Sequence, residues 1–388
     1  MKIGFDISQT GVGKAGCGHY ADAMIRALTQ IAPDDRFLLF ASFGDFYFDA
    51  DLQSRRDLRQ KNVDYAVSVR TREEASELWT SADLDEKLGR LDLVHANNYW
   101  CPRQLRDTRL VYTLYDLSFI ENPTWTTEAN RVGCFTGVFG AAIAADWIAS
   151  ISQATREHFL RIFPSFPRER IEVIYPCSRF VDSQLQGKRP HSRFNIQPGE
   201  FWLSVGTIEP RKNHRTLVEA YSRYIAGGGA PMPLVLAGGP GWLMDDFPKW
   251  LAGLDIADKI ILTGYATDDE LIWLYSNCYA HVYVSLFEGF GLPVLEGMQF
   301  GAPTIASQST SIPEITRDAG ILLNPLDANE IARALFELSS HPERRSQLSC
   351  AARQRAAEFK WEQSAGELYN LYLKAVATPK QQIARLRA

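Results

Sequence analysis

The chain has 388 residues, of which 46% are hydrophobic and 22% are charged, and its formal net charge is −5. Because single hydrophobic cores stop growing near about 250–300 residues, this length predicts two domains. The acidic balance argues against a nucleic-acid-binding protein, which usually carries a basic surface to neutralise phosphates. None of the six cysteines forms a C-x-x-C pair. Zinc sites and small disulfide frameworks are therefore not indicated, and reduced thiols in the cytoplasm are expected.

The N-terminus lacks a secretory-signal pattern, since residues 2–7 predict a strand instead of a basic stretch followed by an apolar one. The most apolar stretch, residues 132–145, is shorter than the roughly 20 residues that cross a bilayer. We predict a buried helix there. The expected protein is cytoplasmic, with a peripheral contact at the inner face of the membrane left open.

Short apolar runs alternate with helical patterns along the whole chain, which predicts repeated β-α units and mainly parallel sheets. The first half has predicted helices that include residues 18–30 and 153–163. Its predicted strands are residues 2–7, 36–40, 64–69, 92–95, 109–114, 147–149 and 171–174. Residues 182–200 are polar and contain two glycines and two prolines. This change of composition predicts an interdomain linker after a first domain of residues 1–181.

The second predicted domain covers residues 201–360. Its predicted strands are residues 201–205, 234–237, 259–262, 280–284 and 304–306. Two helix starts have the spacing of a capping box, in which the first side chain accepts from an amide three residues on and a glutamate reaches back. These are Thr267 with Glu270 and Asp327 with Glu330. Residues 361–375, within a last segment of residues 361–388, have the pattern of an amphipathic helix.

Gly11, Gly13 and Gly16 form a G-x-G-x-x-G pattern after the first predicted strand. A dinucleotide site of this type needs an acidic residue at the end of the second strand, and residues 39–42 contain none. Lys14 is not followed by Ser or Thr, so a P-loop is not indicated either. Two interpretations stay open: a flexible turn, or a loop whose amides and Lys14 contact a phosphate or the acceptor.

The densest functional signal follows the predicted strand 280–284 and opens a helix near residue 292. It comprises Glu288, Gly289, Phe290, Gly291, Leu292 and Glu296. Amides at a helix N-terminus form an anion site, and glycines allow the backbone to approach a ligand closely. We expect Glu288 at the loop rim, where it accepts hydrogen bonds from sugar hydroxyls. Glu296 is expected about two turns inside the helix, where it accepts from two ribose hydroxyls.

Arg211 and Lys212 follow the first strand of the second domain. Adjacent cations there suit a diphosphate whose negative charge grows as it departs, although such a pair is often a solvated surface. Other loops that suit a ligand contain Gly206, Gly238, Gly239, Gly264 and Tyr265. They all follow strands, and ligands of open α/β sheets bind at that carboxyl edge. The shared edge predicts a single binding site.

Glu288 and Glu296 enclose seven residues within E-G-F-G-L-P-V-L-E. This run resembles the E-x7-E motif of retaining glycosyltransferases with the GT-B architecture, of the family-4 or group 1 type. Gly206, Arg211-Lys212-Asn213, Gly264-Tyr265 and the run S-I-P-E at residues 311–314 have the matching spacing. The resemblance is specific over the second domain and looser over the first. It implies an α/β fold of two Rossmann-like domains facing a central cleft, with the C-terminal helix packing across both.

The resemblance also implies roles for the site residues. Arg211 and Lys212 would bind the donor pyrophosphate, Glu288 the sugar, Glu296 the ribose, and the backbone near Gly264 and Tyr265 the base. No cofactor or metal is implied, and the D-x-D pairs at residues 49–51 and 83–85 are interpreted as surface.

The implied reaction moves a sugar from a nucleoside diphosphate to an acceptor hydroxyl with retained anomeric configuration. Similarity to bacterial polysaccharide enzymes makes GDP-mannose the first candidate donor, and a glycan or lipid-linked glycan the expected acceptor. A glycan phosphorylase, a nucleotide-sugar epimerase and a non-catalytic sugar-nucleotide-binding protein stay open as alternatives.

The first domain departs from the family pattern after the predicted strand 109–114. Many family members have His-Asp there, and this chain has Tyr115 and Asp116. Asp116 is a candidate to orient the acceptor or to stabilise positive charge on the sugar, or else it caps a turn or helix. His95, at the end of another predicted strand, is expected to be an interior group and not a catalyst.

Overall fold

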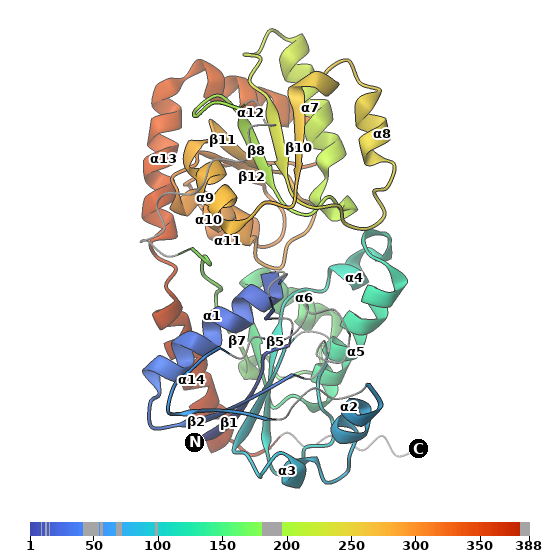
Figure 1. Cartoon of the computed structure of the whole chain (residues 1–388), viewed down its shortest axis with the longest axis vertical. Coiled ribbons are helices and arrows are strands. Elements are labelled where there is room, and N and C mark those ends of the chain that lie inside the picture. The colour runs from blue at the N-terminus through green and yellow to red at the C-terminus, as the bar shows by residue number, and fades with distance from the viewer. Residues whose placement is uncertain are drawn as a thin grey trace. The chain divides into compact units, whose positions relative to one another are not determined.

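The computed structural model describes residues 1–380 except 9, 12, 13, 15, 42–53, 55, 56, 67–71, 98, 99 and 181–195. The chain forms two compact units (Figure 1). The N-terminal unit contains Met1–Ile120, Glu128–Arg179 and Lys360–Ala388, and the C-terminal unit contains Glu121–Thr127 and Phe180–Phe359. The predicted linker lies mostly outside the described residues.

The N-terminal unit contains a seven-stranded sheet in the order β3-β2-β1-β4-β5-β6-β7, and all of its strand pairs are parallel. Its strands are β1 Lys2–Asp6, β2 Arg36–Phe40, β3 Val63–Tyr65, β4 Leu93–Ala96, β5 Arg109–Leu114, β6 Trp147–Ser150 and β7 Ile171–Val173. Its helices are α1 Gly16–Ile31, α2 Arg72–Trp79, α3 Leu84–Lys87, α4 Ser118–Glu121, α5 Glu128–Ala144, α6 Gln153–Ile162 and α14 Trp361–Ala377. The strand order reverses between β1 and β4, which creates a topological switch point.

Helix α14 completes the N-terminal unit, where it packs against α1, β4, β5 and β6 (Figure 1). The Ser364 hydroxyl donates to the carbonyl of Tyr175 at 2.7 Å, and the Tyr372 hydroxyl shares a hydrogen bond with Nδ1 of buried His95. The other ring nitrogen of His95 lies 2.6 Å from the Thr113 hydroxyl. His95 is therefore a satisfied interior group, as expected. The packing of this helix across both domains stays a prediction.

Helix α5 differs from the fully buried helix that its apolar sequence predicts. Val132, Phe135 and Phe139 are exposed, and the last two rings stack with centroids 5.4 Å apart. Their spacing puts them on one face of the helix, while Val138 and Ala141 face the core. The helix is thus buried on one side only. No helix in the described part of the chain combines the length and apolar content that crossing a membrane requires.

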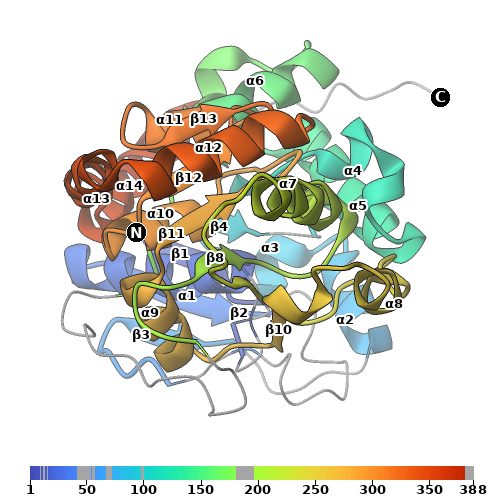
Figure 2. The ribbon, with the colours of Figure 1, turned by 90° about the horizontal axis from the view of Figure 1, so that it is seen from above.

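The C-terminal unit contains a six-stranded parallel sheet in the order β10-β9-β8-β11-β12-β13. Its strands are β8 Trp202–Val205, β9 Leu234–Ala237, β10 Ile260–Gly264, β11 Ala280–Tyr283, β12 Thr304–Ser307 and β13 Ile321–Leu323, of which β13 was not predicted. Its helices are α7 His214–Ala226, α8 Phe247–Ala252, α9 Asp268–Asn277, α10 Leu292–Gln299, α11 Ile312–Thr316, α12 Ala328–Ser340 and α13 Pro342–Ala356. Helices α7 and α12 lie side by side (Figure 2). The α/β class with two mainly parallel sheets is confirmed.

The two predicted capping boxes have different outcomes. At α9 the Thr267 side chain accepts from the Glu270 amide, and the Glu270 side chain accepts from the Thr267 amide. At α12 the Asp327 side chain caps the helix, but Glu330 accepts from the amide of Asn324 instead of reaching back. The second box is therefore only half formed, because the preceding turn presents another donor to Glu330.

Candidate active site

The candidate site lies at the carboxyl ends of β8 and β11, which are neighbours in the sheet although β9 and β10 separate them in sequence. This is the switch point of the C-terminal unit, where open α/β sheets bind ligands. Two hydrogen bonds join the loops that follow these strands. The Leu286 amide donates to the Arg211 carbonyl at 2.8 Å, and the Asn213 side chain donates to the Val284 carbonyl at 3.1 Å. The fold thus brings together two segments that are far apart in sequence.

Five side chains at this point form what we call the charge cluster: Glu209, Arg211, Lys212, Tyr283 and Glu288. Glu288 Oε2 accepts from Arg211 Nη1 at 2.9 Å, and Glu288 Oε1 accepts from Lys212 Nζ at 2.7 Å and from the Tyr283 hydroxyl at 2.9 Å. Arg211 Nη2 donates to buried Glu209 at 2.7 Å. Two cations and two carboxylates therefore lie in direct contact.

The electrostatics of the charge cluster favour an ionised Glu288. Burial alone would raise the pKa of Glu288, but the positive charges of Arg211 and Lys212 outweigh it and lower the pKa to about 2. Burial raises the pKa of Tyr283 well above its ordinary value, and the Glu288 charge adds to this effect. Tyr283 is thus a neutral donor and Glu288 a charged acceptor.

The burial of these residues corrects one sequence-based expectation and rules out one alternative. Glu288 is only 6% exposed, so it does not lie free at the loop rim, because the loop folds it back onto the cations. The Arg211 and Lys212 side chains are 17% and 12% exposed and are paired with buried carboxylates. They are therefore not a solvated surface pair, although part of each remains accessible.

The loop before α10 is held by polar contacts and by one glycine. The Ser311 hydroxyl donates to the carbonyls of Glu288 at 3.0 Å and Phe290 at 2.6 Å. Gly291 has a φ of 111°, and a Cβ there would lie 2.5 Å from Ile312 Cδ1, so only glycine fits. Phe290 is buried and packs against Phe359. The loop is thus a fixed support for Glu288. Gly289 precedes Phe290 in this loop, and Leu292 follows Gly291 as the first residue of α10.

Glu296 is the fifth residue of α10 and is buried. The helix begins at Leu292 as predicted, but the advance of four residues from Leu292 to Glu296 makes only about one turn and not two. The Tyr275 hydroxyl donates to Glu296 Oε2 at 3.2 Å. Its ribose role stays a prediction.

The remaining predicted donor residues also follow strands of this sheet. Gly206, next to β8, lies close to Lys212, since a Cβ at this glycine would be 3.6 Å from Lys212 Cε. Gly264 ends β10 with a φ of 68°, and Tyr265 after it is 71% exposed. A binding role for the backbone of Gly264 and Tyr265 stays a prediction.

Asp116 lies in the N-terminal unit, after β5, and its side chain closes a turn before α4. Its Oδ1 accepts from the amide of Ser118 at 2.9 Å and from the Ser118 hydroxyl at 2.8 Å, at the start of α4. The turn interpretation is thus realised, and a catalytic role stays a prediction. The Tyr115 hydroxyl donates to the carbonyl of Cys17 at 3.3 Å and to Asn97 Oδ1 at 3.4 Å.

The sequence-based search missed Asp6, which is fully buried at the carboxyl end of β1. Its Oδ1 accepts from the Ser8 amide at 2.9 Å, and its Oδ2 accepts from the Asn97 amide at 3.5 Å. An aspartate that ends an otherwise apolar first strand was the available signal. In the neighbouring glycine loop, Lys14 lies 3.4 Å from Asp22. Gly13 of that loop lies outside the described residues.

The second D-x-D pair is only partly a surface feature. Asp83 is exposed, but Asp85 is buried and its carboxylate accepts from three backbone amides, of which those of Arg106 and Thr108 are 2.7 and 2.8 Å away. The prediction of a surface residue is wrong for Asp85, because a distant loop supplies its partners. The pair at residues 49–51 lies outside the described residues. Across the described ranges, no group of three or more His, Cys, Asp or Glu side chains is arranged to hold a metal ion.

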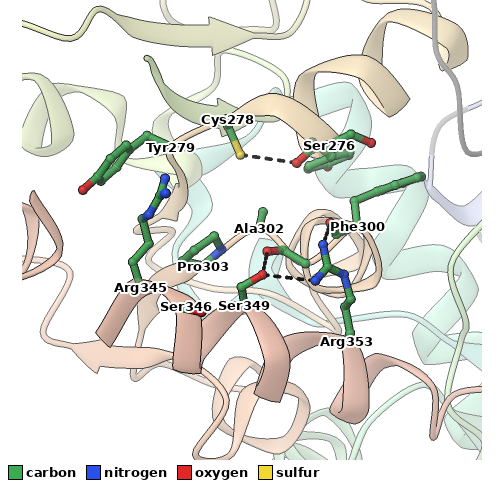
Figure 3. A pocket seen from close by; sticks show the side chains of 12 residues that line it. Ser276, Cys278, Tyr279, Phe300, Ala302, Pro303, Arg345, Ser346, Ser349 and Arg353 are labelled. Atoms are coloured by element: carbon green, nitrogen blue, oxygen red, sulfur yellow. Dashed lines mark hydrogen bonds between the residues drawn. The ribbon is translucent and has the colours of Figure 1, made fainter. Parts of the chain in front are cut away.

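A cavity of about 250 Å³ lies elsewhere in the C-terminal unit, beside the amino ends of β11 and β12 (Figure 3). Its two arginines already have structural contacts. Arg353 donates to the carbonyl of Phe300 at the end of α10, and Arg345 lies over the ring of Tyr279, 4.4 Å from its centroid. The cavity is at the opposite edge of the sheet from the charge cluster, so we do not assign it to the same ligand.

Comparisons with known proteins relate the chain to glycosyltransferases. Residues 190–355 match the family model described as Glycosyl transferases group 1. O-antigen chain mannosyltransferase B of Escherichia coli is 26% identical over 388 residues, which cover 96% of this chain and 99% of that protein. Serotype-specific mannosyltransferase WbdA of Escherichia coli is 34% identical over 231 residues, which cover 58% of this chain but only 25% of that longer protein.

Among solved structures, sucrose-phosphate synthase from Thermosynechococcus elongatus has a TM-score of 0.71 at 22% identity, over 97% of this chain and 99% of that one. At this level of identity the likeness is one of fold. It supports the GT-B architecture that the sequence resemblance implies, and the cleft between the domains stays a prediction.

Proposed function

The chain is a glycosyltransferase of the GT-B fold whose C-terminal unit carries a glycosyl transferases group 1 domain, and we propose that it transfers mannose from GDP-mannose to an acceptor hydroxyl. The proposed acceptor is a growing polysaccharide, as in O-antigen synthesis, and the anomeric configuration is retained. The mannosyltransferase names of two relatives support the sugar, and their similarity favours a transferase over a phosphorylase or an epimerase.

The observation that carries the proposal is the meeting of Arg211, Lys212 and Glu288 at the switch point of the group 1 domain. A departing nucleoside diphosphate gains negative charge in the transition state, and preorganised cations stabilise that charge. In the proposed reaction the departing phosphate takes the proton of the acceptor hydroxyl on the same face of the sugar. The pair Arg211 and Lys212 would then stabilise the leaving group while Glu288 holds the sugar hydroxyls.

The charge balance of the cluster sets a requirement for donor binding. Arg211 and Lys212 are already paired with Glu209 and Glu288. A bound diphosphate would therefore add negative charge to a neutral group, and further donors must compensate for it. The positive end of the α10 helix dipole, beside Glu288, is suited to this.

A donor panel tests the proposal directly. The full-length protein is incubated with GDP-mannose, UDP-glucose and UDP-galactose and a polymannose acceptor, and products are analysed by mass spectrometry and by NMR of the new anomeric centre. We expect transfer from GDP-mannose alone, with the configuration of the donor. Transfer from a uridine nucleotide alone would refute the donor, and an inverted product would refute the stereochemistry.

We further propose that the transfer needs no divalent metal, since the cations of the charge cluster are suited to the diphosphate. Activity in excess EDTA should equal activity in its absence. A complete loss that Mg²⁺ or Mn²⁺ restores would contradict this part of the proposal.

A lipid-linked acceptor would place the enzyme at a membrane surface, and α5 offers a face for such a contact. Val132, Phe135 and Phe139 are exposed on one side of this helix, and Arg131 precedes them. Replacement of the three apolar residues by Ser should abolish co-sedimentation with vesicles that contain anionic lipid, while transfer to a soluble acceptor persists. Equal co-sedimentation of the variant would refute the contact.

A further inference from the structure

We propose that two buried tyrosines are positioning residues for the two glutamates: Tyr283 for Glu288 and Tyr275 for Glu296. Each tyrosine hydroxyl holds one carboxylate oxygen in the orientation that the donor meets. The inference rests on the proposed function, because it assigns Tyr283 to the sugar side of the donor and Tyr275 to the nucleoside side.

Tyr283 is the last residue of β11 and is buried. Its hydroxyl donates to Glu288 Oε1 at 2.9 Å and accepts from Lys212 Nζ at 2.7 Å. The Lys212 ammonium also lies 5.3 Å from the centroid of the Tyr283 ring. Tyr283 is therefore the neutral member of a triangle in which the other two members are charged.

This neutrality distinguishes Tyr283 from the other partners of Glu288. If a diphosphate engages Arg211 and Lys212, it competes with Glu288 for both cations. A phenol hydroxyl that remains protonated has much weaker attraction for the diphosphate, because it has no net charge. Tyr283 can thus keep Glu288 Oε1 in place while the cations change partners, so that the carboxylate meets the sugar in a fixed orientation.

Tyr275 performs the corresponding task for Glu296 from a different element. It lies on α9, is buried, and donates to Glu296 Oε2 at 3.2 Å. Its ring stacks on Phe300 with a centroid distance of 6.1 Å. Tyr275 lies near the end of α9 and also lines the cavity beside the amino ends of β11 and β12, so it supports Glu296 from the amino side of the sheet.

One buried histidine touches both tyrosine rings. His281 lies edge-on to Tyr275, with centroids 5.5 Å apart, and its centroid is 5.8 Å from that of Tyr283. A Cβ on Gly297 would lie 2.9 Å from His281 Nδ1, so α10 packs directly on the imidazole. The two hydroxyls therefore project from rings that are fixed against the same interior group.

The expected effects of removing the two hydroxyls are different. Tyr283→Phe should lower kcat by about tenfold, because a hydrogen bond to a charged group is lost, while the Kd of bare GDP changes less than about twofold. Tyr275→Phe should raise the Kd of GDP and the KM of the donor by a similar factor of about tenfold. Its kcat at saturating donor should stay close to the wild-type value.

The test measures kcat and KM by steady-state kinetics and the Kd of GDP by isothermal titration, in the full-length protein. The matched control is Tyr221→Phe, which removes another buried hydroxyl of the same unit, one that donates to the Met232 carbonyl at 2.7 Å. Met232 precedes β9, at the edge of the sheet away from the charge cluster. Thermal melting checks folding, and assays are run below the lowest melting temperature so that every variant is measured folded.

Glu288→Gln and Glu296→Gln are measured in parallel. If these two variants separate into a kcat effect and a Kd effect but both tyrosine variants behave like Tyr221→Phe, the positioning inference is overturned and the proposed function stands. If the glutamate variants themselves have wild-type kinetics and GDP affinity, the proposed function of the site fails. A Tyr283→Phe protein that loses GDP affinity while Tyr275→Phe keeps it would also overturn the inference.

Discussion

Each unit places a buried carboxylate beside the switch point of its sheet but surrounds it differently. In the N-terminal unit, Asp6 ends β1 beside the switch point and accepts hydrogen bonds from Ser8 and Asn97. In the C-terminal unit, Glu288 follows β11 beside the switch point and accepts from Arg211 and Lys212. Each sheet therefore provides a place for a buried carboxylate beside its switch point, whereas the loops determine whether cations lie next to that carboxylate.

This difference is the reason why we propose that the donor binds to the C-terminal unit. A diphosphate needs positive charge, and the charge cluster has two accessible cations at the carboxyl edge of its sheet. The Asp6 network is instead made of amides and a hydroxyl, which suit neutral hydroxyl groups. We expect substitutions at the charge cluster to affect turnover far more than equivalent substitutions near Asp6.

The largest effect is expected for the double variant Arg211→Ala, Lys212→Ala. Each charge-assisted hydrogen bond is worth roughly 1.5–3 kcal/mol, so turnover should fall by at least about 100-fold in a donor-saturated assay. The melting temperature should also fall, because Glu209 and Glu288 lose their counter-charges while buried. Arg168→Ala, which breaks an exposed ion pair with Glu157, is the control and should leave both quantities nearly unchanged. Near-normal turnover of the double variant would exclude this pair as the diphosphate site.

The next prediction compares the effects on turnover of changing Glu288 and Asp6. Glu288→Gln should lower turnover by about tenfold or more, because an uncharged amide accepts more weakly from cations and sugar hydroxyls. Asp6→Asn keeps an oxygen that accepts from Ser8, so turnover should change by no more than about threefold. The measurement is kcat at saturating donor for both variants. Equal losses would mean that the N-terminal network is as important for the chemistry as the charge cluster.

A smaller effect is expected on the pH dependence of stability. It arises from buried histidines such as His95 in the N-terminal unit and His281 in the C-terminal unit. Burial lowers the pKa of each to about 3 from an ordinary value of 6.5. Below pH 6.5 the unfolded chain takes up protons that the folded chain does not. Stability is therefore full above pH 6.5 and falls as the pH is lowered towards 3, by up to about 1.4 kcal/mol per pH unit for each histidine.

Chemical denaturation between pH 7 and pH 4 measures this slope. His281→Leu should have a shallower dependence than the wild type, since one proton-linked group is removed. His95→Leu should behave alike in slope but also lose stability at pH 7, because Tyr372 and Thr113 lose their hydrogen-bond partner. Identical slopes in the wild type and both variants would contradict the prediction.

The smallest effect is expected for Tyr115→Phe. The hydroxyl makes two long hydrogen bonds, of 3.3 and 3.4 Å, and one of them reaches the Asn97 side chain of the Asp6 network. Their loss should cost less than about 1 kcal/mol of stability and change kcat less than about threefold. Thermal melting and kinetics measure both, and a loss of activity near that of Glu288→Gln would instead give Tyr115 a direct role.

The sequence predicted most strands because buried parallel strands are continuous apolar runs with turn residues between them. Strand β13, Ile321–Leu323, was missed because one isoleucine and two leucines do not distinguish a short buried strand from part of a buried helix. The exposed face of α5 was missed because glycines and alanines make its whole sequence apolar, so the pattern does not show which side packs.

The motif residues of the candidate site could be identified from spacing, but their contacts could not. Glu288 is buried because Arg211, Lys212 and Tyr283 approach it from two strands that are neighbours only in the folded sheet. The same applies to Asp85, whose amide partners come from residues 106–108. Segment Glu121–Thr127 belongs to the C-terminal unit although its composition does not differ from its surroundings.

Helix α14 has a consequence for how the chain acquires its structure during synthesis. The helix supplies Tyr372 to His95 and covers β4, β5 and β6, yet the ribosome makes it after the whole of Phe180–Phe359. The C-terminal unit can therefore finish folding first, while the N-terminal unit, made earlier, waits with an apolar face of its sheet uncovered. The N-terminal unit thus completes its packing only after the last helix has been synthesised.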